Sequence, residues 1–277
     1  MLKHLLTLLL LPAVLSAAAA CAETARGVPT PGEQVLCSTR APIGQPFRTP
    51  EEADRPGDDV TVESEEIVDL SYWLYLPTDE SARTAKGFPV LLLLHGAGGG
   101  GDLEALKGFA FPGSLGPEAS KTWPFITVTP ACPAESRWSA EQLLPILDRV
   151  LADTPADPDR VYVMGVSMGG YGTWMMLVKA HDRVAAGIPF CGGCDPAEAS
   201  RLADMPVWAF HGEKDTVVLP RRSVDIVRAI KERGGEKVRL TLYPDCDHDC
   251  WTRTYRDPAL YRWLLDQSLA DRRTAEP

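Results

Sequence analysis

Residues 159–172 read Asp-Arg-Val-Tyr-Val-Met-Gly-Val-Ser-Met-Gly-Gly-Tyr-Gly, and this segment is the most informative part of the sequence about the fold. Residues 161–166 form a short, uninterrupted apolar run, which predicts a buried strand, and a helical pattern follows it. The motif Gly165-x-Ser167-x-Gly169 lies between the two. In that context it predicts a nucleophile elbow, a tight strand-to-helix turn that exposes the serine above a sheet. Side chains at the two glycine positions would clash where strand and helix cross. The alternative is a Gly/Ser loop between buried elements.

Alternating apolar segments extend this pattern along the chain. Residues 88–94 and 125–129 are unbroken apolar runs, which predict strands buried on both faces, as in a parallel sheet. Residues 60–68 and 70–76 alternate apolar with polar side chains, which predicts a pair of half-exposed antiparallel strands. Further strands are expected at residues 185–190, 206–210 and 237–242, and helices at residues 139–151, 221–233 and 257–269. Ser139 is the expected N-cap of the first of these helices. This succession predicts an α/β fold with a doubly wound, mostly parallel sheet and helices on both faces.

Length and charge bound the domain organisation and the partners. A chain of 277 residues suits one catalytic domain, which we expect at residues 60–270. The connection at residues 191–205 is too short to hold a cap domain, so we expect an uncovered site. The formal net charge is −10, which argues against nucleic acid as a partner. No internal run is long and apolar enough to predict a membrane span.

The N-terminus has the composition of an export signal. A basic start precedes a leucine-rich run at residues 5–15 and a string of alanines. This pattern predicts a signal peptide at residues 1–22 and a secreted or periplasmic protein. Cys21, directly after the alanines, leaves open a lipoprotein anchored through that residue. Residues 23–59 are rich in Pro, Gly, Thr and acidic side chains, which predicts a flexible N-terminal arm.

Two later loops supply the partners that a serine nucleophile needs. A serine hydroxyl attacks only when a base takes its proton, and a carboxylate orients that base. In a fold of this kind the order along the chain is Ser, Asp, His, each in a loop at the carboxyl end of a strand. Asp215 follows the strand expected at residues 206–210, and His248 follows the one at residues 237–242. We therefore predict a triad of Ser167, Asp215 and His248. The alternative is a solvated loop aspartate and a histidine without a catalytic role.

A glycine-rich loop follows the strand expected at residues 88–94. Residues 95–101 read His-Gly-Ala-Gly-Gly-Gly-Gly, and glycines let backbone N–H groups approach a substrate oxygen closely. We predict an oxyanion hole with one donor from the Met168 N–H and one from near Ala97. A phosphate-binding loop is the alternative, but no Gly-Lys-Ser/Thr ends the stretch and no dinucleotide-binding pattern follows it. The sequence thus predicts no cofactor.

Cysteine usage fits an exported chain. The sequence has 7 cysteines, of which six remain when Cys21 is set aside. An even number in an exported protein predicts disulfides, although the sequence does not fix their pairing. The four that lie toward the predicted base loop are Cys191, Cys194, Cys246 and Cys250. Bridges among them would hold the base in register, whereas a zinc site built from the same residues is the alternative. We predict disulfides and no metal.

Several motifs recur together in one order. They are Tyr72-Trp-Leu-Tyr-Leu-Pro, His95-Gly-Ala-Gly, Pro130-Ala-Cys-Pro with Arg137-Trp-Ser, Gly165-Val-Ser-Met-Gly-Gly, Cys191-Gly-Gly, Gly212-x-x-Asp215-x-x-Val218 and His248-Asp-x-Trp251. Through them the chain resembles the α/β-hydrolase superfamily, specifically its exported prolyl-oligopeptidase-like carboxylesterases, which include feruloyl-type esterases and predicted peptidases. The resemblance covers residues 60–267. It implies Ser167 as nucleophile, His248 as base and Asp215 as orienting acid.

Four further residues are expected to contact the substrate, namely Gly96, Gly98, Trp138 and Trp251. Trp138 follows a strand end on the edge that carries the serine, where an aromatic ring can form a pocket wall. The alternative is that this tryptophan packs on the core at the start of a helix. The chain departs from the resembled enzymes in its glycines after Gly98, where they often carry a charged pair. It departs again at Cys250, where a serine is common, and this suggests an added crosslink beside the base.

These expectations combine into one functional hypothesis and two alternatives. We expect a secreted serine hydrolase that cleaves carboxylic esters through an acyl-enzyme. Its substrate would be a small-molecule or polysaccharide-linked ester, such as a short-chain, acetyl or feruloyl ester. A serine peptidase of the prolyl-oligopeptidase type is the first alternative. A non-catalytic binding protein on the same fold is the second.

Overall fold

The computed structural model of the protein describes residues 30–42, 67–99 and 102–274. The expected signal peptide, the possible anchor at Cys21 and most of the first expected antiparallel strand, residues 60–66, lie outside these ranges. Within them, no helix is both long enough and apolar enough to cross a membrane.

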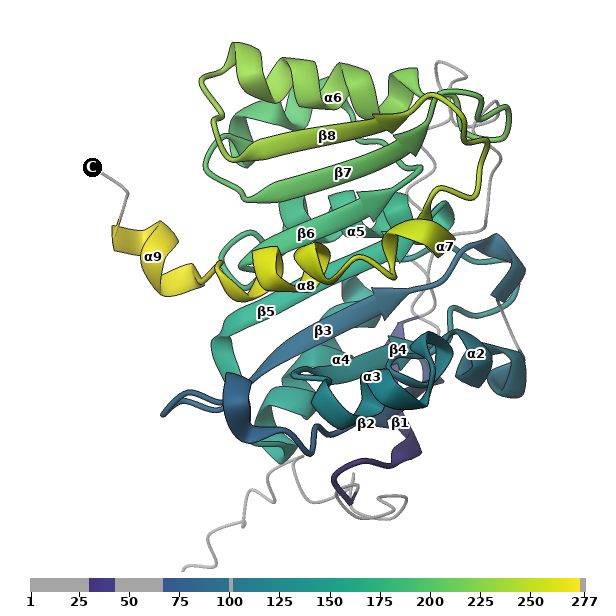
Figure 1. Ribbon diagram of the computed structural model, residues 1–277, viewed down its shortest axis with the longest axis vertical. Helices are drawn as coiled ribbons and strands as arrows, with labels where there is room; N and C mark the ends of the chain where they lie inside the picture. The colour runs from purple at the N-terminus through teal and green to yellow at the C-terminus, as the bar shows by residue number, and fades with distance from the viewer. Residues whose placement is uncertain (1–29, 43–66, 100–101, 275–277) are drawn as a thin grey trace, which may run out of the picture.

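A sheet of eight strands organises the described chain, in the order β1-β2-β4-β3-β5-β6-β7-β8 (Figure 1). The strands are β1 Gln34–Pro42, β2 Ile67–Tyr75, β3 Phe88–Leu94, β4 Ile126–Pro130, β5 Ala156–Val166, β6 Ala186–Phe190, β7 Val207–Gly212 and β8 Val238–Tyr243. All pairs from β4 through β8 are parallel, whereas β1–β2 and β2–β4 are antiparallel. The predicted mostly parallel sheet is confirmed.

Helices cover both faces of this sheet (Figure 1). The α-helices are α2 Leu103–Phe109, α3 Pro117–Thr122, α4 Ala140–Asp153, α5 Met168–Lys179, α6 Arg221–Glu232, α7 Trp251–Thr254, α8 Pro258–Leu265 and α9 Leu269–Thr274. The 3-10 helices are η2 Glu80–Ala82, η3 Ala97–Gly99, η4 Gly113–Leu115 and η5 Pro196–Leu202. One core contains Leu143 of α4, Trp174 of α5 and Ile226 of α6. A second core contains Leu260 and Trp263 of α8. The sheet therefore separates two hydrophobic cores, as a doubly wound fold requires.

The two central strands explain the unbroken apolar runs in the sequence. Successive residues of a strand point to opposite faces of the sheet. In β3, Leu92 belongs to the first core and Leu91 to the second, and in β5, Val163 and Met164 divide in the same way. All four are at most 1% exposed. Burial contributes about 25 cal/mol per Å² of apolar surface, so strands buried on both faces contribute strongly to the stability of the sheet.

The N-terminal edge of the sheet corrects two expectations. The predicted flexible arm at residues 23–59 is wrong over Gln34–Pro42, because this segment forms β1 and pairs antiparallel with β2. The expected boundary between a strand at residues 60–68 and a strand at residues 70–76 is also wrong. One continuous strand, β2, runs from Ile67 to Tyr75 and pairs with β1 and β4. Composition was misleading here because β1 is a half-exposed edge strand between Pro- and Gly-containing segments.

The connection from β6 to β7 is short, as the sequence predicts. It runs through residues 191–206 and contains one 3-10 helix, η5, which packs against α6. Ala199 and Leu202 of η5 are fully buried. No cap domain is built from this connection, which confirms that part of the predicted fold.

The helix α4 begins where the sequence places its N-cap. Ser139 Oγ accepts a hydrogen bond from the Gln142 N–H at 3.3 Å, and Gln142 Oε1 accepts one from the Ser139 N–H at 3.1 Å. This capping box satisfies two backbone donors at the start of the helix. The Gln142 amide also donates to Ser136 Oγ at 3.4 Å. The cap thus ties α4 to the loop that follows β4.

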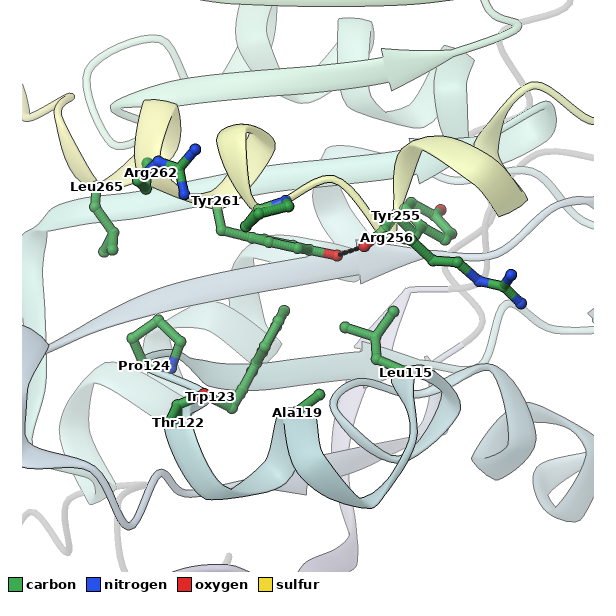
Figure 2. A pocket seen from close by; sticks show the side chains of 11 residues that line it. Leu115, Ala119, Thr122, Trp123, Pro124, Tyr255, Arg256, Tyr261, Arg262 and Leu265 are labelled. Carbon is green, nitrogen blue, oxygen red and sulfur yellow. Dashed lines mark hydrogen bonds between the residues drawn. The ribbon is translucent and has the colours of Figure 1, made fainter.

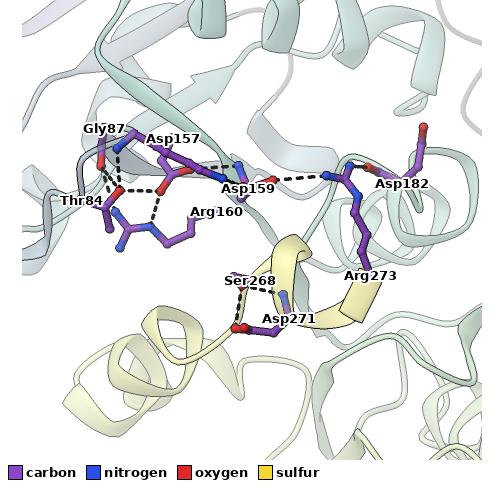
Figure 3. A network of polar contacts seen from close by, with 10 residues as sticks. Thr84, Gly87, Asp157, Asp159, Arg160, Asp182, Ser268, Asp271 and Arg273 are labelled. Atoms are coloured by element: carbon purple, nitrogen blue, oxygen red, sulfur yellow. Dashed lines mark hydrogen bonds and ion pairs between the residues drawn. The ribbon is translucent and has the colours of Figure 1, made fainter. Parts of the chain in front are cut away.

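A polar network fixes the opposite, amino-terminal end of β5 (Figure 3). Asp157 accepts hydrogen bonds from Thr84 Oγ1 at 2.8 Å and from Arg160 Nε at 2.9 Å. Asp159 pairs with Lys86 and lies 3.4 Å from Arg273 of α9. Asp157 and Arg160 are largely buried, so their charges are compensated within the network. Ion pairs therefore hold the amino-terminal end of β5, whereas Ser167 directly follows its carboxyl end.

The crossing of β5 and α5 depends on two glycines. A Cβ atom on Gly165 would lie 2.3 Å from the Gly169 carbonyl oxygen and 2.8 Å from Leu94 Cβ. A Cβ atom on Gly169 would lie 2.1 Å from the Leu94 carbonyl oxygen. These distances are far below van der Waals contact and involve backbone atoms, which cannot rotate away. The predicted clash at both glycine positions is confirmed.

We expect Gly169→Ala to lower the free energy of unfolding by about 3 kcal/mol or more, because its methyl group overlaps the β3 backbone. Gly108→Ala is the matched control, since a Cβ atom there meets nothing within 4 Å. Gly108 lies inside α2, where alanine stabilises a helix relative to glycine by up to about 1 kcal/mol. Urea denaturation measures both. Equal stability of the two variants would contradict the tight crossing.

Candidate active site

Ser167 occupies the turn between β5 and α5 in a conformation that non-glycine residues rarely adopt. Its φ is 54° and its ψ is −116°. Its N–H donates to the Phe190 carbonyl at 2.9 Å, which fixes the turn against the end of β6. A strained residue that the surrounding contacts hold in place is typical of functional sites. The structure therefore has the elbow that the sequence predicts.

Asp215 and His248 meet above the neighbouring strands. His248 Nδ1 lies 2.7 Å from Asp215 Oδ2. Asp215 Oδ1 accepts hydrogen bonds from the N–H groups of Val217 at 2.8 Å and Val218 at 2.9 Å. The aspartate comes from the loop after β7 and the histidine from the loop after β8. The carboxylate is thus held by its own loop and orients the imidazole.

The electrostatics of this pair follow from its hydrogen bonds. Burial acts to raise the pKa of Asp215, but hydrogen bonds from His211, His248 and two backbone N–H groups outweigh it and hold that pKa well below its usual range. Burial acts to lower the pKa of His248, but the hydrogen bond to Asp215 and the contact with Cys191 raise it to about 9. Asp215 is therefore a carboxylate at neutral pH.

The loops that carry the serine and the histidine meet at Cys191. This residue follows Phe190, whose carbonyl accepts from the Ser167 N–H, and its own Sγ donates to the His248 carbonyl at 3.0 Å. Ser167 Oγ itself makes no hydrogen bond to His248 among the described contacts. Catalytic hydrogen bonds often form only when a substrate is bound. The structure brings the acid and the base together and places the serine on the adjoining loop.

The glycine-rich loop after β3 lies beside the serine. A Cβ atom on Gly96 would lie 3.5 Å from Ser167 Cβ, so Gly96 is next to the elbow. The N–H groups of Ala97 and Met168 begin η3 and α5, and neither has an acceptor among the described residues. Free N–H groups at a helix start are suited to binding an oxyanion. Gly98 is exposed and a Cβ atom there would meet nothing within 4 Å, so its glycine is not required by close packing.

His95 supports this loop, a role that the sequence analysis did not assign. His95 Nε2 accepts from the Cys132 N–H at 3.0 Å, and Nδ1 lies 2.6 Å from the Gly96 carbonyl, to which it donates. The ring is therefore neutral with its proton on Nδ1, and burial lowers its pKa. A histidine at the end of a buried strand, before a glycine, was the available signal. It fixes the turn that positions Gly96 and Ala97.

Trp138 lies behind the same loop and is largely buried. It is 7% exposed, and its indole N–H donates to the His95 carbonyl at 3.1 Å. Its ring meets the His95 ring edge-on, with centroids 4.9 Å apart. A Cβ atom on Gly172 of α5 would lie 2.9 Å from this tryptophan. The burial of the ring and the bonded indole N–H favour the core-packing alternative, and the contact of Trp138 with substrate stays a prediction.

Trp251 lies beside the base. Its ring meets the His248 ring at right angles, with centroids 5.3 Å apart. The residue begins α7, directly after Cys250, and is half-buried. The structure places it where it borders the site, and its contact with substrate stays a prediction.

The six cysteines within the described ranges carry no disulfide. Free thiols are found at all six described positions, namely Cys37, Cys132, Cys191, Cys194, Cys246 and Cys250. Cys191 Sγ and Cys250 Sγ lie 3.2 Å apart, both in the core. The residues whose ligand atoms gather within 4.8 Å are Cys191, His211 and Asp215, which is not the set that the zinc alternative named. Both oxygens of Asp215 already accept hydrogen bonds, so this cluster has a structural use without an ion.

An apolar cavity of about 410 Å³ lies between α3 and α8 (Figure 2). Trp123, Pro124 and Tyr261 are among its walls, and the Tyr261 hydroxyl donates to the Tyr255 carbonyl at 2.7 Å. None of the predicted catalytic residues lines it. The cavity belongs to the helix-covered face of the sheet and is separate from the candidate site.

Comparison with known proteins agrees with this architecture. The model of the dienelactone hydrolase family matches residues 136–261, a segment that contains Ser167, Asp215 and His248. A solved structure of a thermostable esterase is 30% identical, with a TM-score of 0.60, and the match covers 73% of this chain and 60% of that one. No protein of the curated set matches the sequence significantly.

Two further solved structures show the same fold at low identity. A ferulic acid esterase is 16% identical, with a TM-score of 0.54, and the match covers 84% of this chain and 97% of that chain. Dipeptidyl peptidase 4 of Porphyromonas gingivalis is 16% identical, with a TM-score of 0.56, and the match covers 72% of this chain and only 34% of the peptidase. The strand order, the family match and these structures agree on the α/β-hydrolase fold. Esterases and peptidases both occur among its structural relatives.

We expect Trp138→Ala to lower the free energy of unfolding by about 3–5 kcal/mol, because it leaves a large cavity behind the glycine-rich loop. Trp138→Phe should cost less, since it retains most of the ring contact with His95 and loses the hydrogen bond. Thermal and urea denaturation measure both variants. A stable Trp138→Ala variant with a raised KM would instead restore the pocket-wall interpretation.

Proposed function

We propose that the protein is a serine esterase that cleaves carboxylic esters through an acyl-enzyme. The observation that supports it most is the 2.7 Å contact of His248 Nδ1 with Asp215 Oδ2, together with a serine held in an elbow turn on the adjoining loop. In this proposal His248 takes the proton of Ser167 as the hydroxyl attacks the ester carbonyl. The histidine then returns the proton to the leaving alcohol, and water releases the acid by the reverse steps.

The proposed oxyanion hole consists of backbone donors. The N–H groups of Met168 and Ala97 would hold the negative oxygen of the tetrahedral intermediate, because both begin a helical turn beside Ser167 and have no described acceptor. Asp215 would keep the imidazole in the tautomer that accepts at Nε2. No metal or organic cofactor enters this scheme.

The proposed substrates are small or polymer-linked esters. The short connection between β6 and β7 supports an uncovered cleft, to which acyl groups on a polysaccharide have access. Two structural relatives are a thermostable esterase and a ferulic acid esterase, which supports the ester class. We infer short-chain acyl, acetyl or feruloyl esters as the substrates to test first, together with export to the periplasm or the medium. The alternative localisation is at a membrane, as a lipoprotein anchored through Cys21.

A peptidase is the second candidate function. Its support is the shared fold with dipeptidyl peptidase 4, of which the match covers only 34%. A panel of p-nitrophenyl acyl esters, methyl ferulate, acetylated xylan and peptide amides separates the two functions. Turnover of amides above esters would favour the peptidase.

We expect Ser167→Ala and His248→Ala each to reduce kcat by roughly 10⁴-fold or more, because removing either member disables the whole triad. The double variant should be little slower than either single one. A fluorophosphonate probe should label the wild-type chain at Ser167 and leave Ser167→Ala unlabelled. An unlabelled wild-type chain would favour the non-catalytic binding protein.

The pH dependence should follow the ionisation of His248. Only the neutral imidazole accepts the serine proton, so kcat/KM should rise with pH through the His248 pKa and be lost as pH falls below it. Since the contacts with Asp215 and Cys191 raise that pKa from 6.5 to about 9, we expect the acid limb above 6.5 and toward 9. Asp215→Asn should move this limb to lower pH while the plateau falls.

The matched control for the pH profile is Asp247→Asn. Asp247 is an exposed acid in the same loop, and its Oδ1 accepts from the Asp249 N–H at 3.3 Å. This variant should keep both the limb and the plateau near the wild-type values. A limb that moves equally in both variants would mean that general surface charge, and not the Asp215 contact, sets the ionisation.

A further inference from the structure

A second histidine lies under the candidate pair, and the proposed chemistry does not use it. His211 is the penultimate residue of β7 and is fully buried. Its Nε2 lies 2.8 Å from the Val218 carbonyl and 3.2 Å from Asp215 Oδ2. Its Nδ1 lies 2.8 Å from Ser223 Oγ, at the start of α6. Each ring nitrogen therefore faces a polar partner, which makes the positions of its protons a question of hydrogen-bond geometry.

The serine hydroxyl decides the proton on Nδ1. Ser223 Oγ lies 2.7 Å from the Gly192 carbonyl, and a carbonyl oxygen can only accept. The single hydroxyl proton of Ser223 is therefore directed at Gly192. Its oxygen must then accept from His211, so Nδ1 carries a proton. Were Nδ1 bare, two acceptor oxygens would stand 2.7 Å apart without a proton between them.

The other nitrogen has only acceptors as neighbours. The Val218 carbonyl and the Asp215 carboxylate both lie within 3.2 Å of Nε2, and neither can donate. Nε2 therefore also carries a proton. We propose that His211 is a buried imidazolium, paired with the Asp215 carboxylate that also orients His248.

The surroundings satisfy such a buried ion pair. Its negative partner, Asp215, receives two backbone N–H groups on Oδ1 and two histidines on Oδ2. A buried pair is tolerated when further hydrogen bonds complete both charges. The other titratable groups facing it are His248, Cys191 and Cys250. The Cys191 thiol stays neutral, because its hydrogen bond with Cys250 and its burial raise its pKa well above the usual range.

The consequence for catalysis rests on the proposed function of Ser167 and His248. Two imidazole rings share one carboxylate, and a fixed positive charge on His211 weakens the hold of Asp215 on a proton at His248. His211 therefore acts as a positioning residue that keeps the base neutral at lower pH than Asp215 alone would allow. It touches no reacting atom.

A metal ion is the competing explanation of the same cluster. Ligand atoms of Cys191, His211 and Asp215 lie within 4.8 Å of one another. Coordination needs a bare nitrogen, because a protonated one has no lone pair to offer. The hydrogen bonds of both ring nitrogens favour the imidazolium over the metal ligand.

Nitrogen-15 NMR of the histidine-labelled full-length wild-type protein at pH 7 tests the charge directly. His211 should show two protonated ring nitrogens, with its signals assigned by their loss in His211→Gln. One protonated and one bare nitrogen would overturn the proposal. A stoichiometric shift of these signals on adding zinc alone would instead support the metal site.

Two variants test the effect on the base. His211→Gln removes the charge and keeps a donor near Asp215, and Ser223→Ala removes the acceptor that requires a proton on Nδ1. Both variants should move the acid limb of kcat/KM to higher pH by about one unit. At a pH below the limb, kcat/KM should therefore fall by about tenfold, whereas the plateau at high pH should stay similar. His181→Gln is the control, because His181 pairs with Asp204, whose other oxygen binds Arg272 of α9. It should leave the limb in place.

A purely structural role for His211 would predict a different result. kcat/KM would then fall by the same factor at every pH, and the limb would not move. If His211→Gln does not fold, Ser223→Ala and the wild-type NMR decide the question. If the fluorophosphonate fails to label Ser167, the proposed esterase function fails, whereas the NMR signals of His211 still decide its charge and those of His248 still report the shift.

Discussion

The backbones of β3, β5 and α5 pack so closely at Gly165 and Gly169 that no side chain fits between them, and the candidate site depends on this packing. A Cβ atom at Gly169 would lie 2.1 Å from the Leu94 carbonyl of β3, and one at Gly165 would lie 2.3 Å from the Gly169 carbonyl. Because β5 and α5 cross so closely, Ser167 is left in a strained turn with φ of 54°. The strained turn follows a strand that is firmly held, since the side chains of β3 and β5 are buried in cores on both faces of the sheet.

A single carboxylate links the loops at the carboxyl edge. Asp215 is held by backbone N–H groups of its own loop and faces His248 from the loop after β8 and His211 from β7. Each of these contacts restricts the motion of Asp215 or of a histidine beside it. A catalytic arrangement requires such side chains to be held in one orientation. Cys191 joins this group from the loop after β6, through its contact with the His248 carbonyl. The order of the parallel strands brings these loops side by side, which is why residues far apart in sequence share one site.

The glycine-rich loop is held by a different kind of contact. Its conformation depends on His95, which bonds to Gly96 and to the Cys132 N–H, and on Trp138, which packs behind it. These two aromatic rings carry no chemistry, yet they set where Ala97 presents its N–H. Both ring nitrogens of the buried His95 make hydrogen bonds. These bonds favour one conformation of the loop, because another conformation would leave a buried polar group without a partner.

The local features of this protein could be predicted from its amino-acid sequence. Gly165 and Gly169 flanking Ser167, the apolar runs of β3 and β5 and the N-cap at Ser139 all depend on neighbouring residues, so their patterns were sufficient. The chain order of Ser167, Asp215 and His248 also indicated which loops to expect at the candidate site. Three features became visible only in the folded chain: residues 34–42 form an edge strand, Trp138 faces the core and His211 contacts Asp215. These outcomes depend on contacts between segments distant in sequence, where exposure and hydrogen-bond partners follow from packing and leave no periodic signal along the chain.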